Sequence, residues 1–240
     1  MQVMVPVLTL TNRAGGVDRG ACAAYAKRAG GTWLDGFLVS GSLGLGLARS
    51  VAERMSMLEV WLDNVPSVRL LACAWDRAEV EEILLFGVRP VAVLRGAEDD
   101  CAVLELLRSL PAGAYLYSHP QYSPAVLSPA VVEKARAEGV LVAGAKVSKV
   151  ELDEVRALRS AAGPEFELFD GRCRHVKASV ESGATGVVAV PLSTLPADLP
   201  PREDVAALQA VIDRGQAVVD AEPDVASQAT ALLRILVESL

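Results

Sequence analysis

The sequence VLVAGAKV at residues 140–147 is apolar at every position but one. A short run that is apolar on both faces is typical of a strand in a parallel sheet covered by helices. Residues 114–119, AYLYSH, indicate a second buried strand just before it. Between the two, Ser128 followed by Pro129 predicts the start of a helix, and Gly139 its end. The stretch is therefore a strand–helix–strand unit, which predicts an α/β fold with parallel strands.

The same alternation extends in both directions along the whole chain. The predicted strands are Val3–Leu10, Trp33–Ser40, Val68–Trp75, Pro90–Leu94, Ala114–His119, Val140–Val147, Glu165–Phe169 and Gly186–Val190. The predicted helices are Val17–Ala29, Val51–Asp63, Arg77–Phe86, Cys101–Leu110, Pro129–Glu138, Glu151–Ala162, His175–Glu181, Arg202–Ala221 and Val225–Glu238. Strands that each precede a helix, with one extra helix at the end, predict a (β/α)8 TIM barrel with a short C-terminal helical extension. A doubly wound open sheet is the alternative.

We expect one domain, because no linker or low-complexity tract interrupts the 240 residues and a barrel commonly fills that length. Residues 1–200 would hold the barrel through its eighth strand. Residues 201–240 would add the last barrel helix and one further C-terminal helix in the same domain.

Composition excludes several function classes. Apolar residues make up 52% of the chain and charged residues 22%, which predicts a sizeable core. The net charge of −7 argues against nucleic acid or an anionic membrane as the main partner. The N-terminus predicts a strand containing Pro6 rather than a signal peptide, and no apolar stretch approaches the ~18 residues that span a bilayer.

Cysteine and histidine usage predicts a cytoplasmic protein with reduced thiols and no metal. The cysteines are widely spaced and form no C-x-x-C pair, and the chain's only histidines, His119 and His175, do not have ligand spacing. No cofactor is expected. The cysteines are Cys22, Cys73, Cys101 and Cys173.

Three motifs fall where a barrel places its active face, at the C-terminal ends of strands. They are Gly41-Ser42-Leu43-Gly44-Leu45, Tyr117-Ser118-His119-Pro120 and Gly144-Ala145-Lys146, and Gly183-Ala-Thr-Gly186-Val follows them. Their order and spacing over residues 3–200 resemble the dihydrodipicolinate synthase / N-acetylneuraminate lyase family of Schiff-base aldolases. That family has G-T-T-G-E, then Y-N-x-P, then G-I-K, then G-x-x-G-V.

The resemblance implies a barrel whose lysine forms an imine with a 2-oxo acid, commonly pyruvate. Lys146 matches the imine lysine, and Tyr117 matches the tyrosine that moves protons during imine formation and carbon–carbon bond making or breaking. Ser42 stands where the family's first threonine links that tyrosine to a proton relay. The implied partners are a small carbonyl substrate and further copies of the chain, in a dimer or tetramer.

The chain departs from the family pattern at several positions, so the resemblance does not identify the substrate. Leu43 replaces the second threonine, which helps to hold the 2-oxo acid carboxylate, and Leu45 replaces the glutamate of the motif. Ser118 replaces the asparagine beside the tyrosine. Tyr122 stands near the position where the synthase branch has an arginine. Lysine-pathway synthase activity is therefore not expected.

The residues themselves support imine chemistry. A lysine must lose its proton before it attacks a carbonyl, and burial favours the neutral amine. The apolar approach at residues 141–145 predicts such burial for Lys146. Tyr117 lies on the preceding strand, ~4.8 Å away in a sheet, close enough for general acid–base work. For Tyr115 we expect a core role, with a satisfied hydroxyl.

An anionic substrate needs a receptor as well. The candidates are backbone N–H groups of residues 42–44, Arg172 and Arg95. The full set of predicted substrate-binding residues is Gly41, Leu43, Gly44, Ser118, His119, Tyr122, Arg172 and Val188.

The leading hypothesis is a Schiff-base lyase, aldolase or synthase acting on a 2-oxo acid or related carbonyl compound. One alternative is a catalytically degenerate barrel of the same family that serves as a binding or partner protein. A further alternative keeps the imine but uses it for dehydration or for an unusual condensation.

Overall fold

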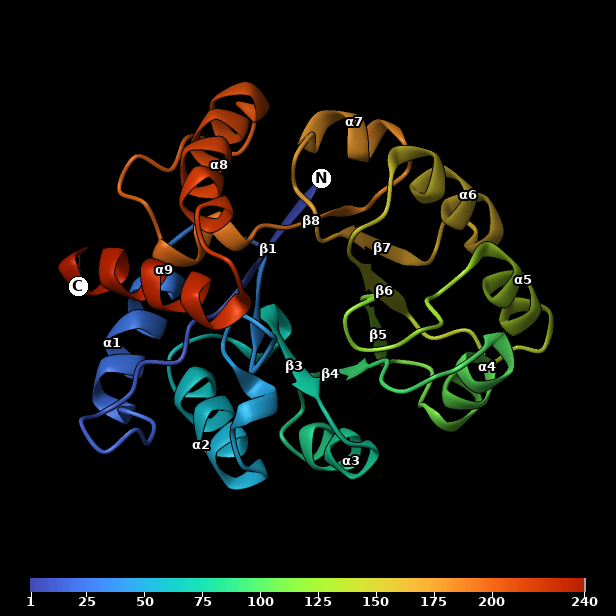
Figure 1. Ribbon diagram of the computed structural model, residues 1–240, viewed down its shortest axis with the longest axis horizontal. Coiled ribbons are helices and arrows are strands. Elements are labelled where there is room, and N and C mark those ends of the chain that lie inside the picture. The colour runs from blue at the N-terminus through green and yellow to red at the C-terminus, as the bar shows by residue number, and fades with distance from the viewer. Residues whose placement is uncertain (240) are drawn as a thin grey trace. The chain divides into compact units, whose positions relative to one another are not determined.

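The computed structural model describes residues 1–239, in which strands and helices alternate and the strands close into a barrel in chain order (Figure 1). This arrangement confirms the predicted (β/α)8 barrel. The strands are β1 (Gln2–Pro6), β2 (Gly36–Val39), β3 (Leu70–Ala74), β4 (Arg89–Val93), β5 (Tyr115–Ser118), β6 (Gly144–Val147), β7 (Glu167–Asp170) and β8 (Gly186–Val188).

A helix follows each strand, and the predicted additional helix closes the described chain. The α-helices are α1 (Arg19–Gly30), α2 (Val51–Leu62), α3 (Arg77–Leu85), α4 (Asp100–Ser109), α5 (Pro129–Ala137), α6 (Leu152–Ala162), α7 (Val176–Glu181), α8 (Val205–Asp220) and α9 (Val225–Ser239). Short 3₁₀ helices are η1 (Gly46–Ala48), η2 (Ser67–Arg69) and η3 (Val190–Thr194). Within residues 1–239, none of these helices has the length and apolar character needed to cross a membrane.

Strand ends are the main difference from the sequence prediction. The first predicted strand extends to Leu10, whereas β1 ends at Pro6, although Val7 and Leu8 are completely buried. The eighth was predicted to reach Val190, but residues 190–194 form η3, which has proline in its first turn. An apolar composition predicts that a segment is buried, but it does not predict that the segment is a strand. These two segments are buried and lie outside the sheet.

Residue contacts divide the chain into two compact units, which are described separately. The first comprises residues 1–2 and 74–188, and the second comprises residues 3–73 together with the chain from residue 189 onward.

The 74–188 unit holds strands β4 to β8, and its register places the predicted catalytic pair side by side. Val93 pairs with Tyr117, Tyr117 with Lys146, and Lys146 with Phe169, all in parallel ladders. The next residues along β5, β6 and β7 alternate with these, so Leu116, Ala145 and Leu168 lie in a core shared with α4, α5 and α6. The apolar face of each helix therefore fixes the strands that carry the site.

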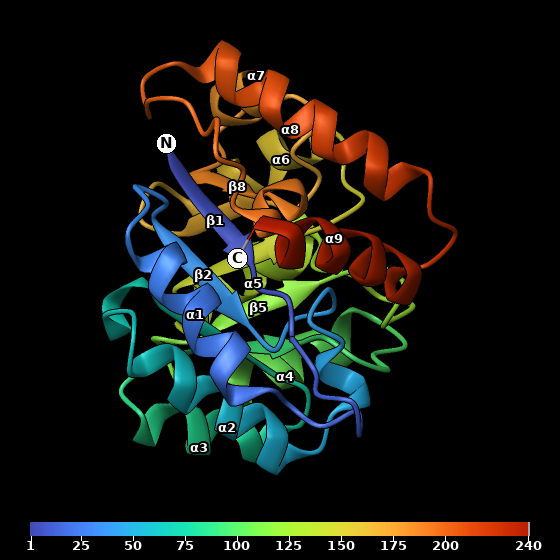
Figure 2. The same ribbon diagram turned by 90° about the vertical axis from the view of Figure 1, so that its left-hand side faces the viewer.

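The unit that begins at Val3 holds β1 to β3, with parallel pairing of β1 to β2 and of β2 to β3. Trp61 packs against Tyr25 and Phe37, with ring centroids 5.3 and 5.2 Å away, and so ties α2 to α1 and β2. α8 and α9 lie beside one another in this unit (Figure 2). Arg28 of α1 donates hydrogen bonds to Ser239 at the end of α9.

Helix boundaries follow local chemistry that the sequence shows directly. Ser50 and Glu53 form a capping box at the start of α2, and Ser128 caps α5 in front of Pro129. Gly139 follows α5 with a positive φ of 71°, a conformation that glycine adopts without strain.

A cluster of three polar side chains, here called the basal cluster, stands at the first residues of β4, β5 and β7. The Tyr115 hydroxyl accepts a hydrogen bond of 2.8 Å from Arg89 and donates one to Glu167. Burial, together with the hydrogen bond to the Glu167 carboxylate, raises the pKa of Tyr115. Tyr115 is thus a core tyrosine with a satisfied hydroxyl, as the sequence predicted. Gly144 packs directly against its ring.

The close packing at Gly144 gives a stability prediction. A Cβ added at Gly144 would lie 2.6 and 2.9 Å from two Tyr115 ring carbons, well inside normal contact. We expect Gly144→Ala to lower the free energy of unfolding by about 3 kcal/mol. Urea denaturation measures this. Gly113→Ala, where an added Cβ would meet nothing within 4 Å, is the control and should change stability by less than about 0.5 kcal/mol. Equal stability of the two variants would contradict the packing described.

Candidate active site

Lys146 lies near the C-terminal end of β6 and is buried, with 7% of its surface exposed. Its Nζ stands 4.0 Å from the centroid of the Tyr117 ring, so the amine faces the ring of the neighbouring strand. Within the 74–188 unit, no carboxylate forms an ion pair with this amine. A buried amine without an acidic partner is the arrangement that nucleophilic lysines use.

Gly171, directly after β7, provides the space beside the lysine chain. A Cβ at this position would lie 3.0 Å from Cε of Lys146 and would also collide with the Ser148 hydroxyl. The carboxylate of Asp170 accepts a 2.7 Å hydrogen bond from the Arg172 N–H and shapes the turn that contains Gly171. Gly144, on the strand that carries Lys146, provides no such space, because the Tyr115 ring packs directly against it.

Four rings pack against one another in this unit, and we call Trp75, Tyr117, His119 and Tyr122 the aromatic cluster. The Tyr122 ring centroid lies 5.2 Å from that of Trp75, 6.1 Å from that of Tyr117 and 5.5 Å from that of His119. Tyr117 is 2% exposed and Trp75 4%, whereas His119 and Tyr122 are half-buried. The cluster therefore combines two buried rings with two that reach the surface of this unit.

His119 is neutral at physiological pH. Burial and the positive charges of Lys146 and Lys149 lower its pKa to about 4. Its Nδ1 accepts a 2.9 Å hydrogen bond from the Gln121 N–H, so the neutral ring carries its proton on Nε2. His119 is thus a hydrogen-bond donor at Nε2, which fits the predicted role in substrate binding.

The lowered pKa of His119 predicts a pH dependence of stability. Below pH 6.5 the unfolded chain takes up a proton at this histidine, whereas the folded chain stays neutral down to about pH 4. Falling pH in this window therefore favours unfolding, by about 1–2 kcal/mol for a half-buried group in contact with solvent. We expect the melting temperature of the wild type to fall more between pH 7 and pH 4.5 than that of His119→Gln. Parallel curves for the two proteins would show that His119 does not titrate in this way.

The other residues predicted on this unit hold the surrounding loops. The Ser118 hydroxyl accepts a 2.9 Å hydrogen bond from the Leu127 N–H. The Arg172 guanidinium binds the Glu151 carboxylate and the Val150 carbonyl, and Arg95 donates to the Trp75 carbonyl at 3.0 Å. Both arginines proposed as anion receptors therefore already have acceptors. Val188 ends β8 and is buried.

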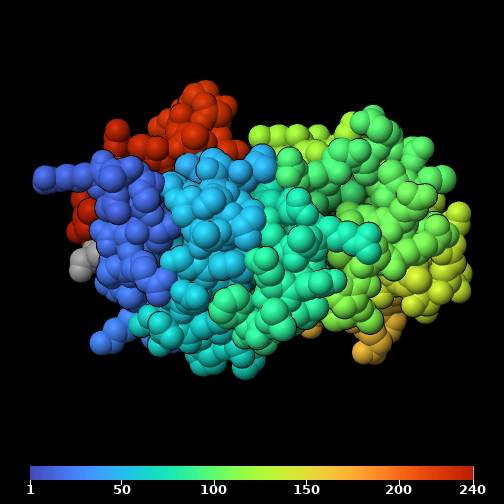
Figure 3. All heavy atoms as spheres, turned by 90° about the horizontal axis from the view of Figure 1, so that it is seen from below, coloured from blue at the N-terminus to red at the C-terminus, as the bar shows by residue number. Residues whose placement is uncertain are grey.

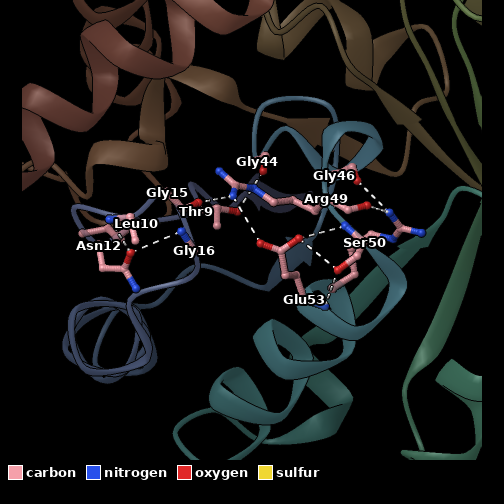
Figure 4. Close-up of polar contacts among 12 residues, drawn as sticks. Thr9, Leu10, Asn12, Gly15, Gly16, Gly44, Gly46, Arg49, Ser50 and Glu53 are labelled. Carbon is pink, nitrogen blue, oxygen red and sulfur yellow. Dashed lines mark hydrogen bonds and ion pairs between the residues drawn. The ribbon is translucent and has the colours of Figure 1, made fainter.

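The predicted residues of the other unit form a tight turn after β2. Ser42 is half-exposed, whereas Gly41, Leu43 and Gly44 are buried. The Thr9 hydroxyl donates a 2.8 Å hydrogen bond to the Gly44 carbonyl (Figure 4). A Cβ at Gly44 would approach the Val7 carbonyl to 2.8 Å, so this position requires glycine.

Two N–H groups in this turn remain available. The turn is closed by hydrogen bonds from Leu45 N to the Ser42 carbonyl and from Gly46 N to the Gly41 carbonyl. Among residues 1–239, no acceptor takes a hydrogen bond from the N–H of Leu43 or of Gly44. Successive N–H groups in a turn are suited to an anion. Arg49 and the capping box of Ser50 and Glu53 hold the following segment (Figure 4).

A pocket of about 250 Å³ lies on the 74–188 unit between β4 and the helices α3 and α4, and Trp75 of the aromatic cluster is part of its wall. Trp75, Val80, Leu94, Arg95, Leu106 and Leu110 are among its lining residues. The outer surface of α3 and α4 is the blue-green and green region of Figure 3. No metal-binding group of three or more His, Cys, Asp or Glu side chains occurs in the part of the chain that the structure describes.

Trp75, Ser148, Gly171 and Thr9 were not predicted from the sequence. The sequence pattern could have indicated Ser148, because this residue lies two positions after Lys146 and so shares its side of the strand. Trp75 ends a predicted strand and Gly171 follows one, both positions at which barrels carry functional residues. Thr9 offered no signal.

Comparison with solved structures identifies the class of fold. A variant of 2-keto-3-deoxygluconate aldolase from Sulfolobus solfataricus superposes with a TM-score of 0.80 at 14% identity, over 98% of this chain and 85% of that one. Sialic acid aldolase from Ruminococcus gnavus gives 0.77 at 16% identity, over 91% and 79%.

Dihydrodipicolinate synthase from Cyanidioschyzon merolae gives 0.72 at 16% identity, over all of this chain and 80% of that one. The chain thus has the barrel fold of these aldolases and synthases, and the resemblance inferred from the motifs is confirmed at the level of the fold. No protein-family profile matches the sequence, and no curated protein matches it by sequence.

Proposed function

We propose that this protein is a Schiff-base lyase or synthase that makes or breaks a carbon–carbon bond through an imine on Lys146. Its substrate is a 2-oxo acid such as pyruvate, or a related carbonyl compound. The observation that carries the proposal is the Lys146 amine, which is buried beside Tyr117 and has no carboxylate partner in its own unit. The structural neighbours are named as aldolases and a synthase, which agrees with this class of reaction.

The proposed reaction gives one role to Lys146 and another to Tyr117. The amine of Lys146, after loss of its proton, attacks the C2 carbonyl of the 2-oxo acid, and loss of water gives the imine. The Tyr117 hydroxyl moves the protons that this addition and elimination require. Loss of a proton from C3 then gives an enamine, whose carbon attacks an aldehyde in the synthetic direction. Cleavage is the reverse.

Two further roles complete the proposal. Ser42 takes the proton-relay role that the resemblance implies for the first hydroxyl residue of its motif. The N–H groups of Leu43 and Gly44, which lack an acceptor among residues 1–239, are suited to an anionic group, as the sequence predicts for the N–H groups of residues 42–44.

Hydrogen–deuterium exchange at the pyruvate methyl group tests the proposal without knowledge of the second substrate. Reversible enamine formation replaces methyl protons with deuterium from the solvent, which proton NMR follows directly. We expect exchange that depends on the wild-type protein and disappears in Lys146→Ala. Exchange no faster than with Lys146→Ala, for pyruvate and a panel of other 2-oxo acids, would contradict the proposal.

A barrel that binds a carbonyl compound without turnover is the second candidate. The buried apolar side chain of Leu43 favours it, because the family carries a threonine there that helps to hold the carboxylate. It predicts that calorimetry detects 2-oxo acid binding while no exchange occurs. In the further alternative, the imine serves a dehydration or an unusual condensation. Identification of the products would distinguish this alternative from carbon–carbon bond cleavage.

We also propose a cytoplasmic homo-oligomer, a dimer or tetramer, as the resemblance implies. α9 exposes Ile235 and Val237, which are 40% and 58% accessible in the single chain. Light scattering at micromolar concentration measures the state directly, and a monomer would contradict this part of the proposal.

A further inference from the structure

We propose that the pocket between β4, α3 and α4 is a second binding site, which takes a monocarboxylate with a compact apolar body. Every residue that lines this pocket belongs to the 74–188 unit. Lys146 is not among the lining residues. The site is therefore separate from the proposed imine chemistry and does not depend on it.

Much of the pocket wall comes from the side of β4 that faces the helices. Val93 pairs with Tyr117, which pairs in turn with Lys146, so these three residues share one face of the sheet. Ala92 and Leu94 alternate with Val93 and face the other way, and both are buried and line the pocket. A ligand bound there would contact the helical layer around the barrel.

Short side chains leave this space open. Ala74, Ala92, Ala97 and Ala102 line the pocket, and so does Gly96, where an added Cβ would meet nothing within 4 Å. Protein interiors are otherwise close-packed, so an apolar space of this kind is available to a ligand. The larger apolar side chains of the wall are Val80, Leu94, Leu106 and Leu110.

The volume of the pocket limits the size of the ligand. The pocket has a volume of about 250 Å³. An apolar cavity of ~150 Å³ takes benzene, so this pocket has room for roughly ten non-hydrogen atoms. A phenyl ring on a short chain, or an alkyl chain of similar size, meets that limit.

Two arginine side chains at the mouth of the pocket provide donors for an anion. Arg77 and Arg95 are exposed, and Asp76 lies beside them in the lining. Among residues 1–239, the Arg77 guanidinium has no hydrogen-bond or ion-pair partner. Arg95 donates to the Trp75 carbonyl, and the Asp76 carboxylate accepts from the Ala78 N–H. Because a guanidinium has five N–H donors, both arginines retain donors that fit a carboxylate.

These features together favour one class of ligand. The apolar walls disfavour a sugar or a nucleotide, whose polar groups would be buried without partners. Two arginines and one aspartate give the mouth a net charge of +1, which favours a ligand with a single negative charge. 3-Phenylpropanoate combines an aromatic ring, a short chain and one carboxylate, and is therefore a suitable probe.

Isothermal titration calorimetry of the full chain with 3-phenylpropanoate tests the site. We expect saturable binding of one molecule per chain, with a Kd of about 1 mM or lower. 3-Phenylpropan-1-ol keeps the ring but has no charge, and acetate keeps the charge but has no ring. Each should bind at least about 10-fold more weakly, because each lacks one of the two contacts.

Two variants address the two ends of the pocket. Arg77→Gln removes the guanidinium that has no partner and should weaken 3-phenylpropanoate binding by about 10-fold. Ala102→Leu fills the space from α4 and should abolish binding. Arg156→Gln is the matched control, because Arg156 is exposed on α6 and pairs with Asp153. It should leave the Kd unchanged, and circular dichroism verifies that each variant is folded.

Lys146→Ala distinguishes this pocket from the proposed imine site, which also takes a carboxylate. We expect this variant to bind 3-phenylpropanoate with the wild-type Kd. Loss of binding in Lys146→Ala together with wild-type binding in Arg77→Gln would overturn the inference. Equal affinity for the alcohol, or no saturable binding below about 5 mM, would overturn it as well. The proposed function is tested separately, by methyl exchange.

Discussion

Lys146→Ala is expected to abolish imine chemistry, with a loss of roughly 10⁴-fold or more in any turnover that the wild type shows. The amine is the nucleophile, and alanine has no atom that can take its place. The side chain is buried but makes no ion pair within its unit, so the variant should remain folded. Turnover and the unfolding transition, measured on the same preparation, separate chemistry from stability.

Lys177→Ala is the matched control for this variant. Lys177 is exposed on α7, where it pairs with Glu181. Its removal should leave both turnover and methyl exchange at the wild-type level. If Lys146→Ala kept more than about a tenth of the wild-type rate, a different nucleophile would be required.

Tyr117→Phe is expected to lower turnover by about 10²–10⁴-fold, the usual contribution of a positioned acid–base group. The ring and its contact with the Lys146 amine are kept, so only the proton-transferring hydroxyl is lost. Single-turnover kinetics of imine formation would locate the affected step.

Tyr115→Phe provides the comparison, because it removes a hydroxyl two residues earlier on the same face of β5. That hydroxyl belongs to the basal cluster with Arg89 and Glu167, and its loss should lower stability while leaving turnover within about threefold of the wild type. Equal loss of activity in both variants would contradict the separate roles of the two tyrosines.

The sequence predicted the fold because its local signals agree with one another. Each buried strand is bounded by a helix whose start or end carries a cap, as at Ser50 and at Gly139. Consecutive strands of such a barrel are neighbours, so the order of the motifs along the chain is enough to predict that Tyr117 lies beside Lys146. The register confirms that neighbour relation.

The features of the site that the sequence did not predict depend on contacts between residues that are far apart in the chain. The pairing of Arg172 with Glu151 removes a predicted anion receptor, and no local pattern announces that pair. The protonation state of His119 depends on charges at Lys146 and Lys149, which the fold brings near. The contact between the Trp75 and Tyr122 rings likewise forms only where the residue after β3 meets the loop after β5.

The lengths of β1 and β8 show a second limit. Val7 and Leu8 are as apolar as a strand interior, yet they lie beyond the end of β1. Periodicity cannot distinguish a buried strand from a buried loop, because both remove apolar side chains from water. Strand boundaries were therefore less accurate than strand order.

Reductive trapping tests imine formation most directly. The protein is incubated with pyruvate and borohydride, digested, and analysed by mass spectrometry. We predict that one reduced pyruvate-derived group is attached at Lys146, that Lys177 is unmodified, and that Lys146→Ala gives no adduct. An adduct on another lysine alone, or none on the folded wild type with pyruvate or any other 2-oxo acid tried, would contradict the proposed chemistry.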